Sequence, residues 1–440
     1  MLGGRVICGK RGCLTLALRQ VAATTNNNVR IGHAPLIRTF LYFCVLCVCP
    51  LEIHFPGIVS RFTDKLAFLD HSDYPSVPIY STIRGDGTRT LDREMLNKIY
   101  RKMVTINTMD KILYESQRQG RISFYMTNTG EEATQIGSAA ALTLADIVYA
   151  QYREAGVLLW RGYPISEFMN QCYGNCKDPS KGRQMPVHYG SKELNFITIS
   201  SPLTTQLPQA VGAAYALKRA RKEACVVCYF GEGAASEGDA HAALNFAATL
   251  DCPVIFICRN NGYAISTPSH QQFKGDGVAA RGPAYGIRTI RVDGNDVLAV
   301  YHATKVAREM TVRERKPVLI EAMTYRIGHH STSDDSTAYR SIEEMDRWNQ
   351  RSPTKNFRDY LQSIGVWNIE HERDLIRSIK KEILTEFAQA EKQLKPSWKE
   401  LFSDVYHSTP GHIRKQMHLM EQHVERYPMR YPLKSFKPTT

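Results

Sequence analysis

The stretch Cys225–Ser266 constrains the fold more than any other part of the chain. It contains an apolar run, Ala224–Phe230, a helical pattern over Ser236–Leu250 and a second apolar run, Val254–Cys258. Short apolar runs of this kind are typical of strands buried on both faces of a parallel sheet. The pattern therefore predicts a strand–helix–strand unit of an α/β fold. The core positions expected in its helix are Ala243, Leu244, Phe246, Ala247 and Leu250.

The turn after the first predicted strand places an acid between two glycines, Gly231-Glu232-Gly233. Glycines allow a sharp turn and the close approach of a ligand to the backbone. The second strand is expected to stop at Arg259-Asn260-Asn261-Gly262. Because open α/β sheets bind cofactors at the carboxyl ends of their strands, both polar segments should contribute to one site.

Two kinds of ligand could bind at this site, a dinucleotide or a metal-bridged diphosphate. A dinucleotide would be held by an acid after the second strand, and Arg259 and Asn260 stand there instead. The charge of Glu232, at about 5 Å from a diphosphate oxygen, would cost roughly 3 kcal/mol at an effective dielectric near 20. A bridging Mg²⁺ reverses that sign, since Mg²⁺ commonly takes one or two protein oxygens together with phosphates. Glu232, the side-chain oxygen of Asn261 and a carbonyl from the next turn would supply those oxygens, which favours a metal-bridged diphosphate.

The spacing of Glu232 and Asn261, 29 positions apart (261 − 232), resembles the thiamine diphosphate motif, with Glu in place of the commoner Asp. The flanking segments 229–241 and 259–266 resemble the α subunits of the decarboxylating component of branched-chain 2-oxoacid dehydrogenases. The resemblance runs from about Phe55 to near the C-terminus. It implies a thiamine diphosphate-binding α/β fold, a mostly parallel sheet with helices on both faces, and a helical C-terminal extension.

The resemblance also implies roles for individual residues. The catalytic residues are His330 and Glu115. The cofactor-binding residues are Tyr152, Arg153, Ser201, Leu203, Gly231, Gly233, Arg259 and His330. The Mg²⁺ ligands are Glu232, Asn261 and the carbonyl of Tyr263, and the K⁺ ligands are Ser200, Pro202, Thr205 and Gln206. The regulatory phosphorylation sites are Ser331 and Ser341. For some of these a structural role is the alternative: oxygen-rich turns are common at helix starts, and Arg153 could form a structural ion pair rather than bind phosphate.

The segment Arg326–Asp335 contains two adjacent histidines, two aspartates and several hydroxyls. Adjacent histidines in an extended chain point apart, so one metal is not expected to bind both. We expect pairing of Arg326 with Asp334 to order this loop, and His330 to position substrate or carry a proton with a pKa in the working range. A phosphate on Ser331 would add about −1.5 to −2 charge beside His330 and disturb that order.

Several other elements are predicted from periodicity. A long amphipathic helix is expected over 91–118, with Leu96, Ile99, Met103, Ile106 and Met109 on its buried face. Further helices are expected from Gly130-Glu131-Glu132 onward, over 293–313 and over 352–395, and strands over 147–150 and 317–325. His188 reads as a hydrogen-bonded structural histidine, Cys225 and Cys228 as core residues, and Gly85-Asp86-Gly87 as a surface turn.

The N-terminal region is basic and free of acids. The whole chain has a formal charge of +13, and its first 51 residues carry six Lys or Arg and no Asp or Glu. This composition predicts a mitochondrial transit peptide, and so a location in the matrix, over a nucleic acid-binding arm. The apolar, Cys-rich stretch 40–51 is shorter than the roughly 20 residues that a membrane-spanning helix needs. We therefore divide the chain into a presequence region 1–55, an extension 56–90, a cofactor-binding domain 91–395 and a partner-packing tail 396–440.

The activity implied by the resemblance is oxidative decarboxylation of the branched-chain 2-oxoacids derived from Val, Leu and Ile, of the 3-methyl-2-oxobutanoate dehydrogenase, lipoamide-accepting type. The implied partners are a β subunit in an α₂β₂ tetramer, which supplies the carboxylate that activates the cofactor, a lipoyl-bearing acyltransferase core, and a regulatory kinase and phosphatase. Neither nucleic acid nor a membrane span is expected. The alternatives are a pyruvate-type α subunit and a catalytically idle nucleotide-binding scaffold.

Overall fold

The computed structural model describes residues 63–82 and 91–438. The chain divides into two units, Met1–Leu69 and Asp70–Thr440. The described end of the first unit, 63–69, contains no helix or strand, and every element discussed below belongs to the second. The predicted presequence region and the turn at 85–87 lie outside the described residues.

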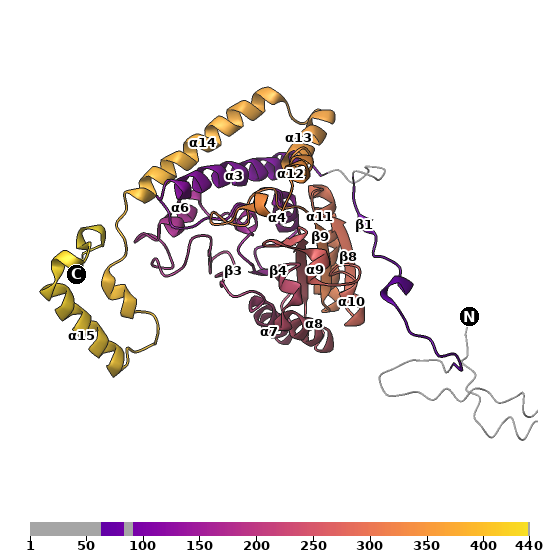
Figure 1. The fold of residues 1–440 in the computed structure, drawn as a ribbon, viewed down its shortest axis with the longest axis horizontal. Coiled ribbons are helices and arrows are strands. Elements are labelled where there is room, and N and C mark those ends of the chain that lie inside the picture. The colour runs from indigo at the N-terminus through magenta and orange to yellow at the C-terminus, as the bar shows by residue number, and fades with distance from the viewer. Residues whose placement is uncertain (1–62, 83–90, 439–440) are drawn as a thin grey trace, which may run out of the picture. The chain divides into compact units, whose positions relative to one another are not determined.

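The second unit is built on a seven-stranded sheet in which every neighbouring pair is parallel, in the order β1-β8-β9-β5-β4-β2-β3 (Figure 1). Its strands are β1 (Ile79–Tyr80), β2 (Ile147–Tyr149), β3 (Phe196–Ile197), β4 (Val226–Gly231), β5 (Val254–Asn260), β8 (Arg288–Asp293) and β9 (Val318–Met323). A separate antiparallel pair joins β6 (Tyr263–Ala264) to β7 (Thr267–Pro268). The predicted parallel α/β architecture is confirmed.

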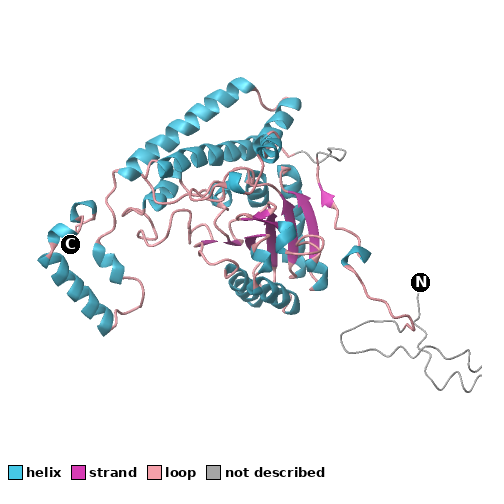
Figure 2. Ribbon diagram, viewed as in Figure 1, coloured by secondary structure: helices cyan, strands magenta, loops and turns pink. Residues whose placement is uncertain are grey.

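Helices cover both faces of this sheet (Figure 2). On one face, α7 (Gln206–Arg219) and α8 (Gly238–Thr249) pack on Val226, Cys228 and Phe230 of β4. On the other face, α3 (Arg93–Arg118), α4 (Glu132–Ala140) and α11 (Val297–Glu314) belong to the core that contains Val227 and Tyr229. Successive residues of a strand point to opposite faces, so one apolar run supplies two cores. Cys225 and Cys228 are buried free thiols, one in each core, which confirms the predicted core role.

The remaining helices lie outside these two layers or connect them. They are α5 (Ala155–Trp160), α6 (Ile165–Tyr173), α9 (Ser269–Gln272), α10 (Arg281–Ala284), α12 (Ile342–Asn349), α13 (Pro353–Ser363), α14 (Ile369–Glu391) and α15 (Gly411–Arg426). Helix α14 packs on both α3 and α6 (Figure 1). None of the helices in the described ranges is long and apolar enough to cross a membrane.

Helix α3 matches its prediction closely. Asp92 caps it by accepting a hydrogen bond from the Met95 amide, and the five apolar residues expected on its inner face are buried. Helix α4 begins at Glu132, where the acidic pair 131–132 predicted a helix start.

Other predictions were wrong in detail. Residues 288–293 form strand β8, and the helix expected from 293 starts only at Val297, after the side chain of Asp296 caps it. Strand β5 continues through Asn260, because Arg259 and Asn260 still pair with β9. In α8, Phe246 and Leu250 are 57% and 39% exposed rather than in the core. The charged segment 352–395 is split into α13 and α14.

Candidate active site

The carboxyl ends of β4 and β5 bring the predicted motif residues together. Gly231 and Arg259 are partners in the sheet register, so Glu232 and Asn261 follow neighbouring strands at one edge. The Asn261 amide donates a hydrogen bond to Glu232 Oε2 at 3.3 Å. The Gly231 amide donates to Gln151 Oε1 at 2.9 Å, and Gln151 lies just beyond the end of β2. Three adjacent strands therefore present polar groups at the edge where α/β sheets bind ligands.

The two glycines of the turn are required for different reasons. A Cβ on Gly233 would overlap the Cβ of Ala264, so this glycine allows the β4 turn to pack against the β6–β7 hairpin. A Cβ on Gly231 would meet no atom closer than 3.8 Å, from Gln151. Gly231 therefore leaves space beside the backbone at the strand end, while Gly233 serves internal packing.

Glu232 is a buried acid with half of its carboxylate unused. The residue is 1% exposed, and its Oε1 has no hydrogen-bond partner among the described residues. Burial, with a smaller contribution from the nearby charge of Glu131, raises the pKa of this carboxyl to about 7. A buried acceptor without a partner is unfavourable. A divalent cation would satisfy the free oxygen and favour the ionised form, so the residue fits a Mg²⁺ ligand.

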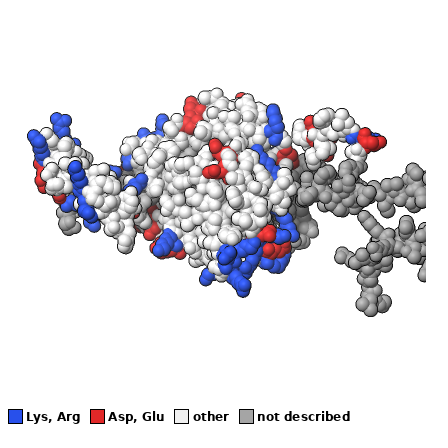
Figure 3. Space-filling model, turned by 90° about the horizontal axis from the view of Figure 1, so that it is seen from below, with Lys and Arg blue, Asp and Glu red and all other residues white. Residues whose placement is uncertain are grey.

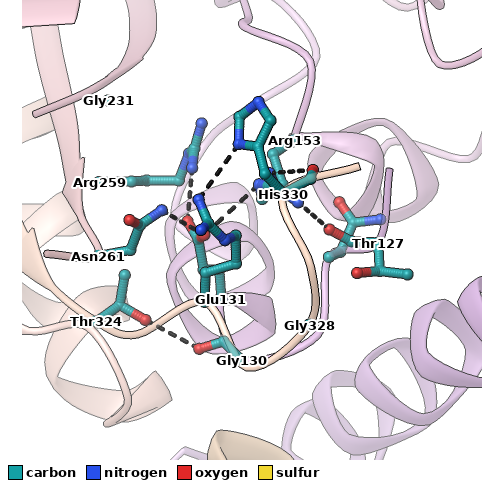
Figure 4. A network of polar contacts seen from close by, with 12 residues as sticks. Thr127, Gly130, Glu131, Arg153, Gly231, Arg259, Asn261, Thr324, Gly328 and His330 are labelled. Carbon is teal, nitrogen blue, oxygen red and sulfur yellow. Dashed lines mark hydrogen bonds and ion pairs between the residues drawn. The ribbon is translucent and has the colours of Figure 1, made fainter. Parts of the chain in front are cut away.

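A second buried acid, Glu131, lies at the centre of the site (Figure 4). Its Oε2 accepts a hydrogen bond from Arg259 Nη1 at 2.5 Å, and its Oε1 accepts one from Asn261 Nδ2 at 2.9 Å. Arg153 Nε forms an ion pair with Oε1 at 3.6 Å, and Arg259 Nε is also paired with Glu154. Burial opposes ionisation here, but Arg259 and Arg153 together hold the pKa of Glu131 below its usual value.

We call Glu131, Glu154, Arg153 and Arg259 the arginine–glutamate cluster. Its two cations and two anions balance, yet Arg153 Nε and Arg259 Nη2 are buried donors without a hydrogen-bond partner in the described part of the chain. Buried guanidinium donors are normally satisfied, and phosphate oxygens suit them well. The cluster therefore fits a phosphate-bearing ligand beside the Glu232 carboxylate.

His330 joins this cluster through Arg153. Arg153 donates through Nη2 to the His330 carbonyl at 3.0 Å and through Nη1 to the Thr127 carbonyl. The imidazole lies 3.2 Å from Arg326 Nη1 and packs edge-on against the Tyr152 ring. Burial, followed by the charges of Arg153 and Arg326, lowers the pKa of His330 to about 3. The expectation of a pKa in the working range was wrong, and His330 is neutral at physiological pH.

The loop that carries His330 is ordered differently from the prediction. Arg326 and Asp334 do not pair directly: the hydroxyl of Tyr339 accepts from Arg326 Nη2 at 2.8 Å and donates to Asp334 Oδ2 at 2.7 Å. The His330 amide also donates to Asp334 Oδ2, at 2.8 Å.

The two histidines of this loop have separate partners. His329 Nδ1 contacts the Ser336 hydroxyl, whereas His330 faces Tyr152 and Arg326. Among the described residues there is no cluster of three His, Cys, Asp or Glu side chains that could hold a metal. A metal bound by one carboxylate, one amide and one carbonyl would not form such a cluster.

The predicted phosphorylation sites differ in environment. Ser331 is buried, and its hydroxyl lies 3.0 Å from that of Ser333. Ser341 is exposed and caps α12 by accepting from the Glu344 amide at 3.1 Å.

The turn before α7 brings together the oxygens predicted for K⁺. The hydroxyls of Ser200 and Thr205 lie 3.1 Å apart, and Thr205 Oγ1 donates to the Pro202 carbonyl at 3.3 Å. Gln206 is buried and donates to the Tyr229 carbonyl at 3.1 Å.

His188 connects its own loop to this turn. Its Nε2 contacts the Ser201 hydroxyl at 2.8 Å and its Nδ1 contacts the Pro186 carbonyl at 3.1 Å, as expected of a hydrogen-bonded structural histidine. Leu203, predicted to contact the cofactor, is 41% exposed.

Glu115 is not brought to this group. Its side chain is exposed on α3 and lines a cleft of about 620 Å³ together with residues of α13 and α14. No contact among the described residues joins it to the arginine–glutamate cluster.

The sequence analysis missed Glu131, Glu154 and Gln151 as site residues. For Glu131, the sequence feature that could have indicated a site residue is the run of small and apolar residues that follows it. An acid beside such a helix is expected to be buried, and a buried charge needs a partner. Glu131 was interpreted only as part of a helix start, although burial of the whole of α4 implied that its carboxylate would need donors.

Comparison with known proteins agrees with this geometry. Residues 100–399 match the family described as the dehydrogenase E1 component. The chain is 58% identical over 391 residues to the mitochondrial 2-oxoisovalerate dehydrogenase subunit alpha of Mus musculus, covering 87% of this chain and 88% of that protein. It is 57% identical over 383 residues to the protein of that name from Caenorhabditis elegans, covering 85% and 89%. The second such subunit of Arabidopsis thaliana is 54% identical over 386 residues, covering 86% and 82%. These findings confirm the resemblance and the mitochondrial location: the chain belongs to the dehydrogenase E1 component family, in the branch of the mitochondrial 2-oxoisovalerate dehydrogenase α subunits.

Proposed function

We propose that this chain is the α subunit of the enzyme component that decarboxylates branched-chain 2-oxoacids, with 2-oxoisovalerate (3-methyl-2-oxobutanoate) as a substrate. The relatives, named for 2-oxoisovalerate and similar over most of their length, support the reaction and the mitochondrial matrix location. Membership of the family implies dependence on thiamine diphosphate. When bound, thiamine diphosphate supplies the electron sink for decarboxylation, while the protein binds, orients and protects it.

The observation that carries the proposal is the pair of unsatisfied buried groups at the β4–β5 edge. Glu232 Oε1 and Arg259 Nη2 each lack a hydrogen-bond partner among the described residues. A diphosphate bridged by Mg²⁺ satisfies both at once. We infer that Glu232, Asn261 and the Tyr263 carbonyl would hold Mg²⁺, and that Arg153, Arg259 and Tyr152 would bind the diphosphate. Gly231, Ser201 and Leu203 would line the rest of the cofactor site, and Gly233 would contribute by letting the turn pack against the β6–β7 hairpin.

In this site, neutral His330 would position the substrate rather than act as a strong acid. Its imidazole is fixed by Arg326 and by the Tyr152 ring, and its backbone by Arg153. Such fixation keeps a hydrogen-bonding group at a defined position, which lowers the entropic cost of the reaction. Glu115 lies on the exposed side of α3. We propose that any catalytic role of Glu115 does not involve contact with the arginine–glutamate cluster.

The turn before α7 would hold K⁺. The clustered oxygens of Ser200, Pro202 and Thr205, with the side chain of Gln206, are hard ligands of the kind that such cations take. An ion there would stabilise the turn that presents Ser201 and Leu203 to the cofactor.

A partner subunit would complete the site. Leu203, in the turn before α7, and Ile265, between β6 and β7, are apolar residues that are 41% and 53% exposed. Figure 3 views the molecule from the side on which α7 and α8 lie in Figure 1. On this face Lys and Arg gather toward the edge, and few charged residues lie in the middle. Such a surface suits burial against another protein. We propose a β subunit in an α₂β₂ tetramer as that partner, a lipoyl-bearing acyltransferase core as the acceptor of the acyl group, and the tail 396–440 as a partner-packing segment after the domain 91–395.

Regulation would act through the His330 loop. A kinase that modifies Ser331 must open the loop, because this hydroxyl is buried, whereas Ser341 is accessible. A phosphate on Ser331 would place charge next to Arg153 and the His330 backbone, and a phosphatase would restore the order.

The test is CO₂ release by the full chain co-expressed with its β subunit, with thiamine diphosphate and Mg²⁺, on 3-methyl-2-oxobutanoate and on pyruvate. Preference for the branched acid is the expected result. Preference for pyruvate would assign the chain to a sister activity on the same fold. Release from neither acid would refute the proposal.

A further inference from the structure

Glu131 makes contacts that link the proposed metal site to the arginine–glutamate cluster. Both of its carboxylate oxygens accept from donors: Oε2 from Arg259 Nη1 at 2.5 Å and Oε1 from Asn261 Nδ2 at 2.9 Å. The side chain is 0% exposed, so water does not substitute for either contact. An amide side chain of this size has one acceptor end and one donor end, whereas an ionised carboxylate accepts at both ends.

The contact with Asn261 decides which end of the Asn261 amide faces the metal site. Because Nδ2 is bound to Glu131, Oδ1 is turned to the opposite side, where it accepts from the Tyr263 amide at 3.2 Å. The Asn261 backbone is held next to Glu232 by the 3.3 Å hydrogen bond to Oε2. A cation requires the oxygen of Asn261, not its nitrogen, on the side of Glu232 and Tyr263.

We infer that Glu131 is a positioning residue for Mg²⁺-dependent diphosphate binding: it orients the Asn261 amide toward the cation and, with the same carboxylate, holds Arg259 for the diphosphate. This inference rests on the proposed function and adds a residue to it. Glu131 does not touch the cation or the substrate itself. Groups that orient the ligands of a metal commonly change its affinity by about 10- to 100-fold when removed.

Glu131→Gln is the discriminating variant. A glutamine must place its NH₂ against either Arg259 or Asn261, both of which are donors, so one contact becomes a repulsion. The Asn261 amide is then no longer fixed, or Arg259 is displaced. The matched control is Glu132→Gln, the next residue in the chain. Glu132 is also buried, and burial raises its pKa to about 8. Its carboxyl accepts a hydrogen bond from the Gly130 amide, and the side-chain oxygen of a glutamine can accept the same bond.

The measurement is the Mg²⁺ concentration that gives half-maximal thiamine diphosphate binding to the α₂β₂ complex, followed by calorimetry. Glu131→Gln is expected to raise it by about 10- to 100-fold. Glu132→Gln is expected to leave it within about twofold. A purely structural role would lower the thermal midpoint without changing the Mg²⁺ requirement, and equal requirements in the two variants would overturn the inference.

A compensating exchange gives a second test that does not depend on the single variant folding well. In Glu131→Gln combined with Asn261→Asp, the glutamine NH₂ donates to the new aspartate, its oxygen accepts from Arg259, and the aspartate faces the cation. Asn261→Asp alone sets two carboxylates against each other. The double variant should therefore need less Mg²⁺ than Asn261→Asp alone, by about tenfold.

The metal site and the positioning role of Glu131 can fail separately. A double variant no better than Asn261→Asp would overturn the role of Glu131 while leaving the metal site intact. Wild-type binding of thiamine diphosphate that is independent of Mg²⁺ would instead overturn the metal site and the inference together.

Discussion

Replacing Glu232 by glutamine should stabilise the protein while destroying its metal site. Burial raises the pKa of this carboxyl from 4.5 to about 7, so the ionised form is destabilised in the fold. The difference between these two pKa values corresponds to roughly 3 kcal/mol. Glutamine has a similar shape and no charge to bury. In the absence of Mg²⁺ and cofactor, Glu232→Gln should therefore raise the free energy of unfolding at alkaline pH.

The sign of the pH dependence follows from linkage. The folded state binds the proton more tightly than the unfolded state, so wild-type stability falls as pH rises from about 4.5 to about 7 and is constant above that. At pH 8 the penalty from Glu232 is roughly 3 kcal/mol, and at pH 5 it is below about 1 kcal/mol. With an unfolding entropy of roughly 2.1 cal/mol/K per residue, the pH 8 penalty is equivalent to a thermal midpoint shift of about 4 °C in a chain of this length.

The assay is thermal unfolding of wild-type and Glu232→Gln α₂β₂ complexes at pH 5 and pH 8, with and without Mg²⁺ and thiamine diphosphate. Without ligands, the variant should unfold at a higher temperature at pH 8, by about 4 °C where the α subunit unfolds as its own cooperative unit, and close to the wild type at pH 5. With both ligands at pH 8 the order should reverse, because only the wild type gains the free energy of binding. A variant that is not stabilised at pH 8, or is stabilised equally at both pH values, would refute the argument that burial destabilises this charge.

Three further predictions concern the same site. Gly233→Ala would drive its Cβ into Ala264, so we expect at least a tenfold loss of cofactor affinity in calorimetry, with recovery when Ala264→Gly is added. Arg259→Met would remove the cation that two buried carboxylates share and leave Glu154 without its ion-pair partner, and we expect a loss of about 3–5 kcal/mol, measured by unfolding of the complex. Ser331→Asp should reduce CO₂ release more than tenfold because the side chain is buried beside the cluster, whereas Ser341→Asp, at an exposed helix N-terminus that favours negative charge, should change it less than twofold.

The local pattern of apolar residues was sufficient to predict the central part of the fold. The strands β4 and β5 and the helices α3 and α4 were predicted because their apolar residues recur with clear periods and their ends carry caps or turns. Strand β8, Arg-Thr-Ile-Arg-Val-Asp, was missed because charged residues interrupt it. Arg291 is tolerated there because Glu321 of the neighbouring strand β9 pairs with it at 2.9 Å, a contact between segments that local pattern does not reveal.

The site could be predicted where its residues belong to one motif and not where they come from distant segments. Glu232 and Asn261 follow two strands that pair, and Arg259 lies near the end of the second, so the sequence was enough to bring them together. Two partners of Glu131, Arg259 and Asn261, lie about 130 positions away in the chain, and only the folded structure shows that the start of α4 meets the end of β5. The pKa of His330 could not be predicted either, since it depends on burial and on two arginines contributed by other elements.

Arg153 gives a physical route by which the His330 loop and the cofactor site can affect each other. One guanidinium donates to the Thr127 and His330 carbonyls and pairs with Glu131, so it cannot turn toward a new anion without releasing one of these. A phosphate on Ser331, the residue after His330, would compete for this cation. Its effect would then extend from the loop backbone to Glu131 and, through Glu131, to Asn261 and Arg259. Loss of cofactor affinity and loss of loop order should therefore occur together, and hydrogen exchange of 328–336 in the Glu131→Gln complex should rise even though Ser331 is unmodified. If exchange in this loop is unchanged while Mg²⁺ affinity falls, the two regions are independent and Arg153 does not couple them.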